Sequence, residues 1–155
     1  MKTYELDELY WYINRKAKSE TKENIYLMTM VSREVRQIVG YAIVTEKSSI
    51  HVQQMVDKAP SAMQYYSDGW AGYADVKYPG TYTMNIHDKS NTFTVESVNA
   101  DIREYIPGLA RKKRCFYRSI DTLKAVFKVF VHAYNQFGRS KYLHSRTHSP
   151  FVNFV

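Results

Sequence analysis

The sequence predicts one α/β domain with a mixed five-stranded sheet, the first three strands antiparallel and helices on the faces of the sheet. Three strand-like apolar runs with short connections come first, which favours an antiparallel meander. Helical apolar stripes and two shorter strand-like runs follow them, and a helix after three strands changes the fold class from all-β to α/β. The 155 residues, 45% of them hydrophobic, suffice for one compact domain and are too few for two ordinary ones.

The first three strands are predicted from alternation of side-chain types. From Thr3 to Ile13 aromatic and branched residues recur with period two, and Asp7 shares a face with apolar neighbours. Polar residues 14–23 predict a hairpin loop. The next apolar runs, Ile25–Val31 and Gln37–Val44, predict the second and third strands.

The chain then changes to helical periodicity. A serine at position 48 or 49 provides an N-cap, and Pro60 ends the predicted helix. Its apolar stripe consists of Val52, Met55, Val56 and Ala59. Met63–Ser67 is the predicted fourth strand, with Asp68 at its carboxyl end, where open α/β sheets gather their ligands.

A fifth strand is predicted at Thr81–Ile86, followed by a helix that Pro107 ends. Helical spacing puts Glu96, Asn99 and Arg103 on one side of this helix, one step round from its buried stripe. The stripe consists of Val95, Val98, Ile102 and Tyr105. Glu96 is therefore expected at the rim of the core.

The last predicted helix stops near Gly138. Its apolar face consists of Leu123, Val126, Phe127, Phe130, Val131 and Tyr134. We expect a folded domain over residues 1–138 and a basic C-terminal tail over residues 139–155.

Charge and cysteine content restrict the function classes. A net charge of +7 favours an anionic partner, either nucleic acid or a membrane surface, although a modest excess of Lys and Arg is also common in ordinary soluble proteins. The single cysteine, Cys115, excludes an intramolecular disulfide and a cysteine-built zinc site. No signal peptide and no apolar run of membrane-spanning length is found, so we expect a cytoplasmic protein without a membrane partner.

Three acids lie in settings from which only folding can bring them together: Asp7 in the first strand, Asp68 after the fourth, and Glu96 on a helix. Carboxylate oxygens are the ligands that hard divalent cations prefer, and two such ions support phosphoryl transfer. Each acid also has an ordinary explanation, as a surface residue, a turn former or a helix-terminus residue. The remaining acids considered are expected at exposed or capping positions: Asp57, Glu104 and Asp121.

Several segments carry a family resemblance over nearly the whole chain. They are Asp7-Glu8-Leu9-Tyr10, Ser67-Asp68-Gly69-Trp70, the run Glu96 to Arg103, Leu109-Ala110-Arg111-Lys112, and Cys115-Phe116-Tyr117-Arg118-Ser119. In order and spacing the chain resembles the DDE transposases of insertion sequence one type, members of the RNase H-like (retroviral integrase) superfamily. The resemblance implies an RNase H-like fold.

The same resemblance implies a catalytic triad that binds metal, formed by Asp7, Asp68 and Glu96. The implied cofactor is Mg²⁺ or Mn²⁺, two ions per site. The implied activity is strand cleavage at the ends of an insertion sequence, followed by transfer of those ends into target DNA.

Further residues are expected to bind DNA. Asn99 and Arg103 match positions of the motif beyond Glu96, where they would contact phosphate or orient Glu96; a solvated ion pair is the alternative for Arg103. Trp70 is expected to stack on an unpaired end base or, alternatively, to pack in the core. The basic residues expected to neutralise phosphates are Arg111, Lys112, Lys113, Arg114 and Arg118.

The resemblance also implies partners for this chain and leaves two other functions open. Transposases of this type carry a zinc-binding and helix-turn-helix region ahead of the catalytic domain, and here the first strand follows Met1 directly. We therefore expect an upstream DNA-binding protein or domain, and a homo-oligomer in the complex with DNA. The alternatives are an RNase H-like nuclease that never joins strands, and a non-catalytic DNA-binding or regulatory fragment of a transposase.

Overall fold

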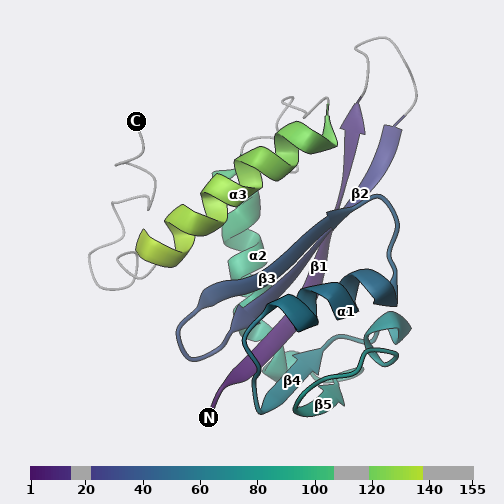
Figure 1. Ribbon diagram of the computed structural model, residues 1–155, viewed down its shortest axis with the longest axis vertical. Coiled ribbons are helices and arrows are strands. Elements are labelled where there is room, and N and C mark those ends of the chain that lie inside the picture. Colours follow the sequence, from purple (N-terminus) through teal and green to yellow (C-terminus); the bar gives the residue numbers. More distant parts are fainter. Residues whose placement is uncertain (15–21, 107–118, 138–155) are drawn as a thin grey trace.

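The computed structural model describes residues 1–14, 22–106 and 119–137, which form a sheet with helices on both sides (Figure 1). The strands are β1 (Thr3–Asn14), β2 (Lys22–Ser32), β3 (Gln37–Val44), β4 (Gln64–Ser67) and β5 (Thr81–Met84). The helices are α1 (Ser49–Lys58), α2 (Phe93–Tyr105) and α3 (Ile120–Phe137), with short 3-10 helices η1 (Ala71–Tyr73) and η2 (Lys89–Asn91).

The sheet is mixed, with strand order β3-β2-β1-β4-β5. Strand β2 pairs antiparallel with β1 and with β3, whereas β4 runs parallel to both β1 and β5. This confirms the predicted α/β class, with its five-stranded mixed sheet and three antiparallel strands, and is consistent with an RNase H-like fold. The parallel pairing also brings the carboxyl ends of β4 and β5 to the same edge.

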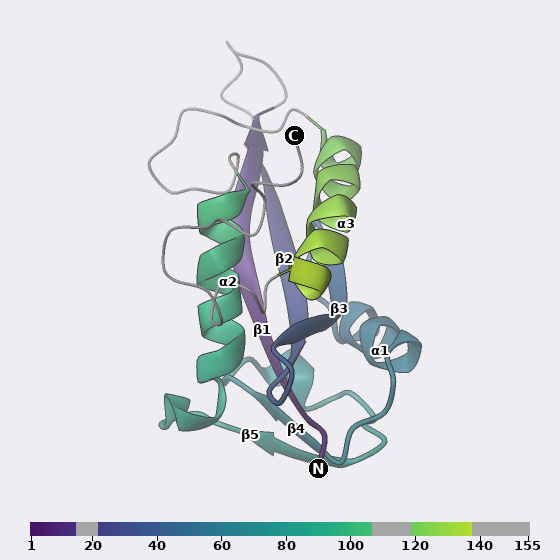
Figure 2. The same ribbon diagram turned by 90° about the vertical axis from the view of Figure 1, so that its left-hand side faces the viewer.

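Each face of the sheet carries its own core. On one face α2 and α3 pack against β1, β2 and β3 through residues such as Leu9, Leu27 and Ile102. On the other face α1 and the segment around Tyr73 pack against Leu6 and neighbouring strand residues. Figure 2 shows α1 and α2 on opposite sides of the sheet. Period-two alternation along β1 explains the two cores, since successive side chains point to opposite faces.

Helix boundaries follow the predicted signals. The hydroxyl of Ser48 accepts a hydrogen bond from the backbone N–H of Ile50, which makes Ser48 the N-cap of α1. Helix α2 ends at Tyr105, just before Pro107, as expected. Gly138 and the predicted tail, residues 139–155, lie outside the described residues.

The start of β5 depends on a close backbone approach. A Cβ added at Gly80 would lie 2.4 Å from the carbonyl oxygen of Ala62 and 2.5 Å from that of Met63. The absence of a side chain thus lets the chain run beside β4, where the N–H of Thr81 donates to the Met63 carbonyl at 2.9 Å. This contact sets the position of β5, which carries one wall of the cleft described below.

None of the helices in the described part of the chain has the length and apolar character needed to cross a membrane.

Candidate metal centre

A cleft of about 300 Å³ opens at the carboxyl ends of β4 and β5, beside β1 and the first turn of α2. All three acids expected in the catalytic site, Asp7, Asp68 and Glu96, line it. Its other lining residues are Gly69, Asn85, Ile86, Lys89 and Thr92. The structure thus brings together, at one place, side chains that are up to 89 positions apart in the sequence.

Asp7 lies on the α2 side of β1, where its carboxylate is partly buried. Its Oδ2 accepts a hydrogen bond of 2.9 Å from the side-chain amide of Asn99. The pKa of Asp7 is raised to about 6, mainly by burial and also by the negative charges of Glu8 and Asp68, against the lowering effect of hydrogen bonds from the Glu8 backbone and from Asn99. Without a cation, ionised Asp7 is therefore poorly solvated.

Asn99 is held in its orientation by Thr29 of β2. The Thr29 hydroxyl donates to Oδ1 of Asn99 at 2.8 Å, so the amide nitrogen faces Asp7. Both residues are buried, with Asn99 3% exposed and Thr29 0% exposed. The role expected for Asn99, a phosphate contact or an interaction with Glu96, stays a prediction; in the structure its amide donates to Asp7.

Replacing Thr29 with valine tests this hydrogen-bonded chain. Thr29→Val keeps the shape of the side chain but leaves the buried Oδ1 of Asn99 without its donor. We expect the free energy of unfolding to fall by about 1–3 kcal/mol, the cost of an unsatisfied buried polar group. Urea denaturation measures the loss. Thr45→Val, at an exposed position, is the control, and equal effects of the two substitutions would contradict the role given to Thr29.

Asp68 follows β4 directly and reaches the same place from the neighbouring strand. Parallel pairing of Leu6 with Ser67 brings residues 7 and 68 side by side. The Oδ1 atom of Asp68 accepts a hydrogen bond of 3.1 Å from the backbone N–H of Trp70, which holds the turn after the strand.

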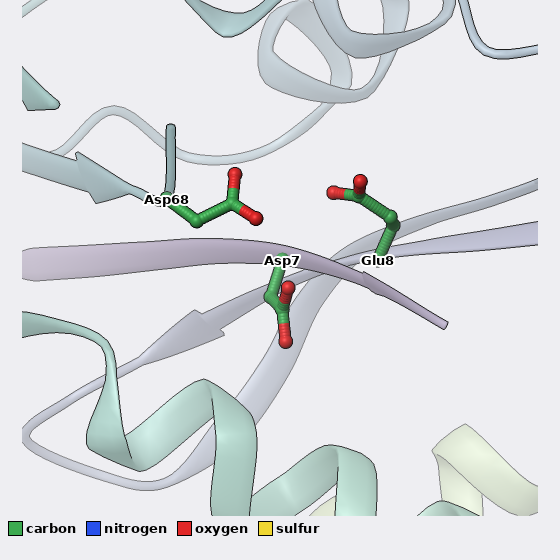
Figure 3. A group of neighbouring side chains, drawn as sticks. All are labelled: Asp7, Glu8 and Asp68. Carbon is green, nitrogen blue, oxygen red and sulfur yellow. The ribbon is translucent and has the colours of Figure 1, made fainter. Parts of the chain in front are cut away.

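Glu8 is a further candidate metal ligand, although it is not among the residues that line the cleft. One carboxylate oxygen from each of Asp7, Glu8 and Asp68 lies within 4.8 Å of the other two. In Figure 3 the side chains of Glu8 and Asp68 point toward each other, and that of Asp7 points away to one side of β1. Tyr73 donates to Glu8 at 2.8 Å, and Lys47 forms an ion pair with it. The only sequence signal for Glu8 was its position next to Asp7.

Glu96 lines the cleft from the first turn of α2. Its side chain is 42% exposed, and its Oε1 lies 3.8 Å from the amino group of Lys89. The hydroxyl of Thr92 lies 3.4 Å from the same oxygen. Glu96 is therefore outside the compact group of three acids but faces the same space.

The predicted DNA-binding residues lie in different places. Trp70 is partly buried against the α1-side core, and the amino group of Lys47 lies 4.4 Å from its ring centroid. Its neighbour Tyr73 is fully buried, so packing is at least part of the role of this segment. Arg103 is in the last turn of α2 and does not line the cleft. The residues Arg111, Lys112, Lys113, Arg114 and Arg118 lie outside the described part of the chain.

The donor set fits a hard divalent cation. Asp7, Glu8 and Asp68 offer oxygen atoms only, and Lys47 is the cation paired with this group among the described residues. The raised pKa of Asp7 reflects first the cost of burying its charge and then repulsion by the negative charges of Glu8 and Asp68. A divalent cation would offset that cost, as Mg²⁺ or Mn²⁺ does in carboxylate sites.

Comparison with protein families identifies the family of the chain that carries this site. A family model described as IS1 transposase matches residues 1–137. The chain belongs to the IS1 transposase family. The match begins at the first residue and ends with the last residue of α3, so it covers every helix and strand described above. No curated protein matches the chain.

Membership in the IS1 transposase family confirms the resemblance found in the sequence. It identifies the chain as a transposase, a protein of DNA transposition and of insertion sequences. The family implies DNA binding and the use of a divalent metal, and the acidic group at Asp7, Glu8 and Asp68 is a place where such a metal fits. The IS1 transposase family thus gives the cleft a chemical context.

Proposed function

We propose that this chain is the catalytic domain of an insertion sequence transposase, a polynucleotidyl transferase that cleaves DNA strands and joins the freed ends to target DNA. Residues 1–138 form its RNase H-like DDE domain, and residues 139–155 form a basic tail. The observation that carries the proposal is that Asp7, Asp68 and Glu96 line one cleft in a member of the IS1 transposase family.

In this proposal Asp7, Asp68 and Glu96 hold two Mg²⁺ or Mn²⁺ ions. When bound, the ions supply charge neutralisation at the scissile phosphate and activation of the attacking oxygen, first of water and then of a 3′ hydroxyl. The protein orients the acids: Asn99 fixes Asp7, and the Trp70 N–H fixes Asp68.

The walls of the cleft offer contacts for the DNA strand. The side-chain nitrogen of Asn85 is buried without a hydrogen-bond partner and lines the cleft, where it can donate to a phosphate oxygen. The amino group of Lys89 lies at the same cleft and carries positive charge. Arg103, the basic residues Arg111–Arg114 and Arg118 extend the proposed DNA contacts, and Trp70 stacks on an end base.

The proposal includes the wider setting of the protein. The transposase acts in the cytoplasm on element ends and target DNA, as a homo-oligomer in the DNA complex, with an upstream zinc-binding and helix-turn-helix protein or domain. That part supplies recognition of the end sequences.

A product assay tests the function. The full chain is incubated with a branched or nicked DNA and Mn²⁺, and labelled products are separated by size. Joined DNA is expected with Mn²⁺ and none after chelation of the metal. Products that are only hydrolysed would replace the proposal with a nuclease, and DNA that is bound but uncut would replace it with a regulatory fragment.

A further inference from the structure

The ion pair of Glu5 and Arg33 belongs neither to the lining of the cleft nor to the group of acids at Asp7, Glu8 and Asp68. Glu5 of β1 is 0% exposed, and its Oε1 lies 2.7 Å from Nε of Arg33, whose side chain is 28% exposed. A buried carboxylate is costly unless it is paired and hydrogen-bonded, and an apolar pair of similar size often gives equal stability. Glu5 lies two residues before Asp7 on the same face of β1, and this position indicates a role beyond stability.

Glu5 holds the beginning of α2. Its Oε2 accepts a hydrogen bond of 2.9 Å from the backbone N–H of Val95. That N–H belongs to the first turn, whose donors have no acceptors within the helix, and Thr92 makes no side-chain cap hydrogen bond. A carboxylate here also interacts favourably with the helix dipole. Glu5 therefore serves as the cap of α2 from a neighbouring strand.

Arg33 holds the segment that enters the helix. Its terminal nitrogen donates to the carbonyl of Asn91 at 2.9 Å. Its guanidinium lies 5.0 Å from the ring centroid of Tyr66 and 6.0 Å from that of Phe93. One arginine thus links Glu5, the end of η2 and the first residue of α2.

Strand β1 consequently holds α2 at two points. Glu5 binds the N–H of Val95, and one turn later Asp7 accepts from Asn99. Glu96 lies between these two helix positions. We propose that Glu5 and Arg33 are positioning residues that fix Glu96 relative to Asp7, acting through the first turn of α2. The inference rests on the metal-binding role proposed for Glu96.

A Mn²⁺ titration of the full chain tests this role, with free Mn²⁺ measured by electron paramagnetic resonance and Tm by circular dichroism. The first variant, Glu5→Met with Arg33→Met, replaces the pair by apolar side chains, so it leaves no buried charge unpaired and should have a higher Tm than a variant that keeps Arg33 without its partner. It removes the acceptor of the Val95 N–H, so we expect Mn²⁺ affinity to fall by about tenfold to a hundredfold.

The second variant, Glu5→Gln, keeps an acceptor for Val95 but unpairs Arg33. We expect it to have a lower Tm than the double variant and yet bind Mn²⁺ more tightly. A merely structural role would make affinity follow Tm, and that result would overturn the inference. Asp101→Asn is the matched control, because Asp101 lies on α2 like Glu96 and its buried carboxylate accepts a hydrogen bond of 2.7 Å from the Tyr134 hydroxyl. This substitution should lower Tm without a tenfold loss of Mn²⁺ affinity.

Repeating the titration in the Glu96→Gln variant tests whether the loss of Mn²⁺ affinity depends on Glu96. In that background the double variant should cause no further loss of Mn²⁺ affinity, and an equal loss in both backgrounds would overturn the inference alone. If Glu96→Gln itself leaves affinity unchanged, the metal role of Glu96 fails and the inference fails with it. If the double variant does not fold, the effect of Glu5→Gln on Mn²⁺ affinity is compared in the wild type and in Glu96→Gln instead.

Discussion

Asp68→Asn is expected to lower metal-dependent strand cleavage by about a thousandfold or more, which corresponds to about 4 kcal/mol of lost transition-state stabilisation. The substitution removes one charge from the three acids that surround the candidate metal position, and a neutral amide is a poorer ligand for a hard cation. The amide oxygen can still accept the hydrogen bond from the Trp70 N–H, so the turn after β4 should persist. Initial rates of cleavage in Mn²⁺ measure the effect.

Asp88→Asn is the matched control for this variant. Asp88 also accepts a hydrogen bond from the backbone two residues on, at 2.8 Å from the N–H of Ser90, but it is exposed and does not line the cleft. Its replacement should leave cleavage within about twofold of the wild type, since no metal ligand changes. Equal activity of Asp68→Asn and wild type, with unchanged circular dichroism, would rule out the metal role of Asp68.

Much of this fold could be predicted because the elements have strong local patterns. Alternating residues predicted β1 to within one residue at its end, and β3 exactly as observed. Differences arose where the end of a strand depends on its partner. Strand β2 begins at Lys22 because β1 continues to Asn14 beside it, and β5 ends at Met84 because β4 ends at Ser67. The local sequence pattern of one strand does not show how far its partner strand extends.

The site was only partly predictable for a similar reason. Sequence order placed Asp68 at a strand end and Glu96 at the rim of a helix, and the cleft is lined by both. Glu8 was missed because alternation assigns it to the face opposite Asp7. Pairing of β1 with β4 stops at Leu6, so beyond that residue the edge of β1 is open and side chains from both faces can approach Asp68. The cap that Glu5 provides for α2 and the contact of Asn99 with Asp7 were also not predicted, because both depend on how α2 packs on β1.

The charges at the cleft oppose the stability of the metal-free fold, and this follows from the position of Asp7. Its carboxylate lies against α2, beside Glu8 and Asp68, with Asn99 as its side-chain hydrogen-bond donor. Only part of the desolvation cost is recovered by that hydrogen bond, since the pKa of Asp7 remains raised to about 6. The three acids are thus held close together by the fold before any cation binds, an arrangement that favours metal binding over stability.

Asp7→Asn is therefore expected to stabilise the metal-free protein at neutral pH while abolishing its Mn²⁺-dependent activity. Because the pKa of Asp7 in the folded state is raised to about 6, above its unfolded value, its stabilising contribution is complete at low pH and is lost as the pH rises through 6. At about 1.4 kcal/mol per pKa unit, the loss above pH 7 is about 3 kcal/mol. Asparagine carries no charge and can still accept from Asn99, so the variant should escape this loss.

Urea denaturation in the presence of a chelator, at pH 4 and at pH 8, measures this difference. At pH 4 the two proteins should have similar free energies of unfolding, and at pH 8 Asp7→Asn should be the more stable by about 2–3 kcal/mol. Adding Mn²⁺ at pH 8 should raise the stability of the wild type and leave the variant nearly unchanged, because a ligand stabilises only the protein that binds it. Asp75→Asn, at an exposed position, should show neither effect. A variant less stable than the wild type at pH 8 without metal would contradict the electrostatic role of Asp7.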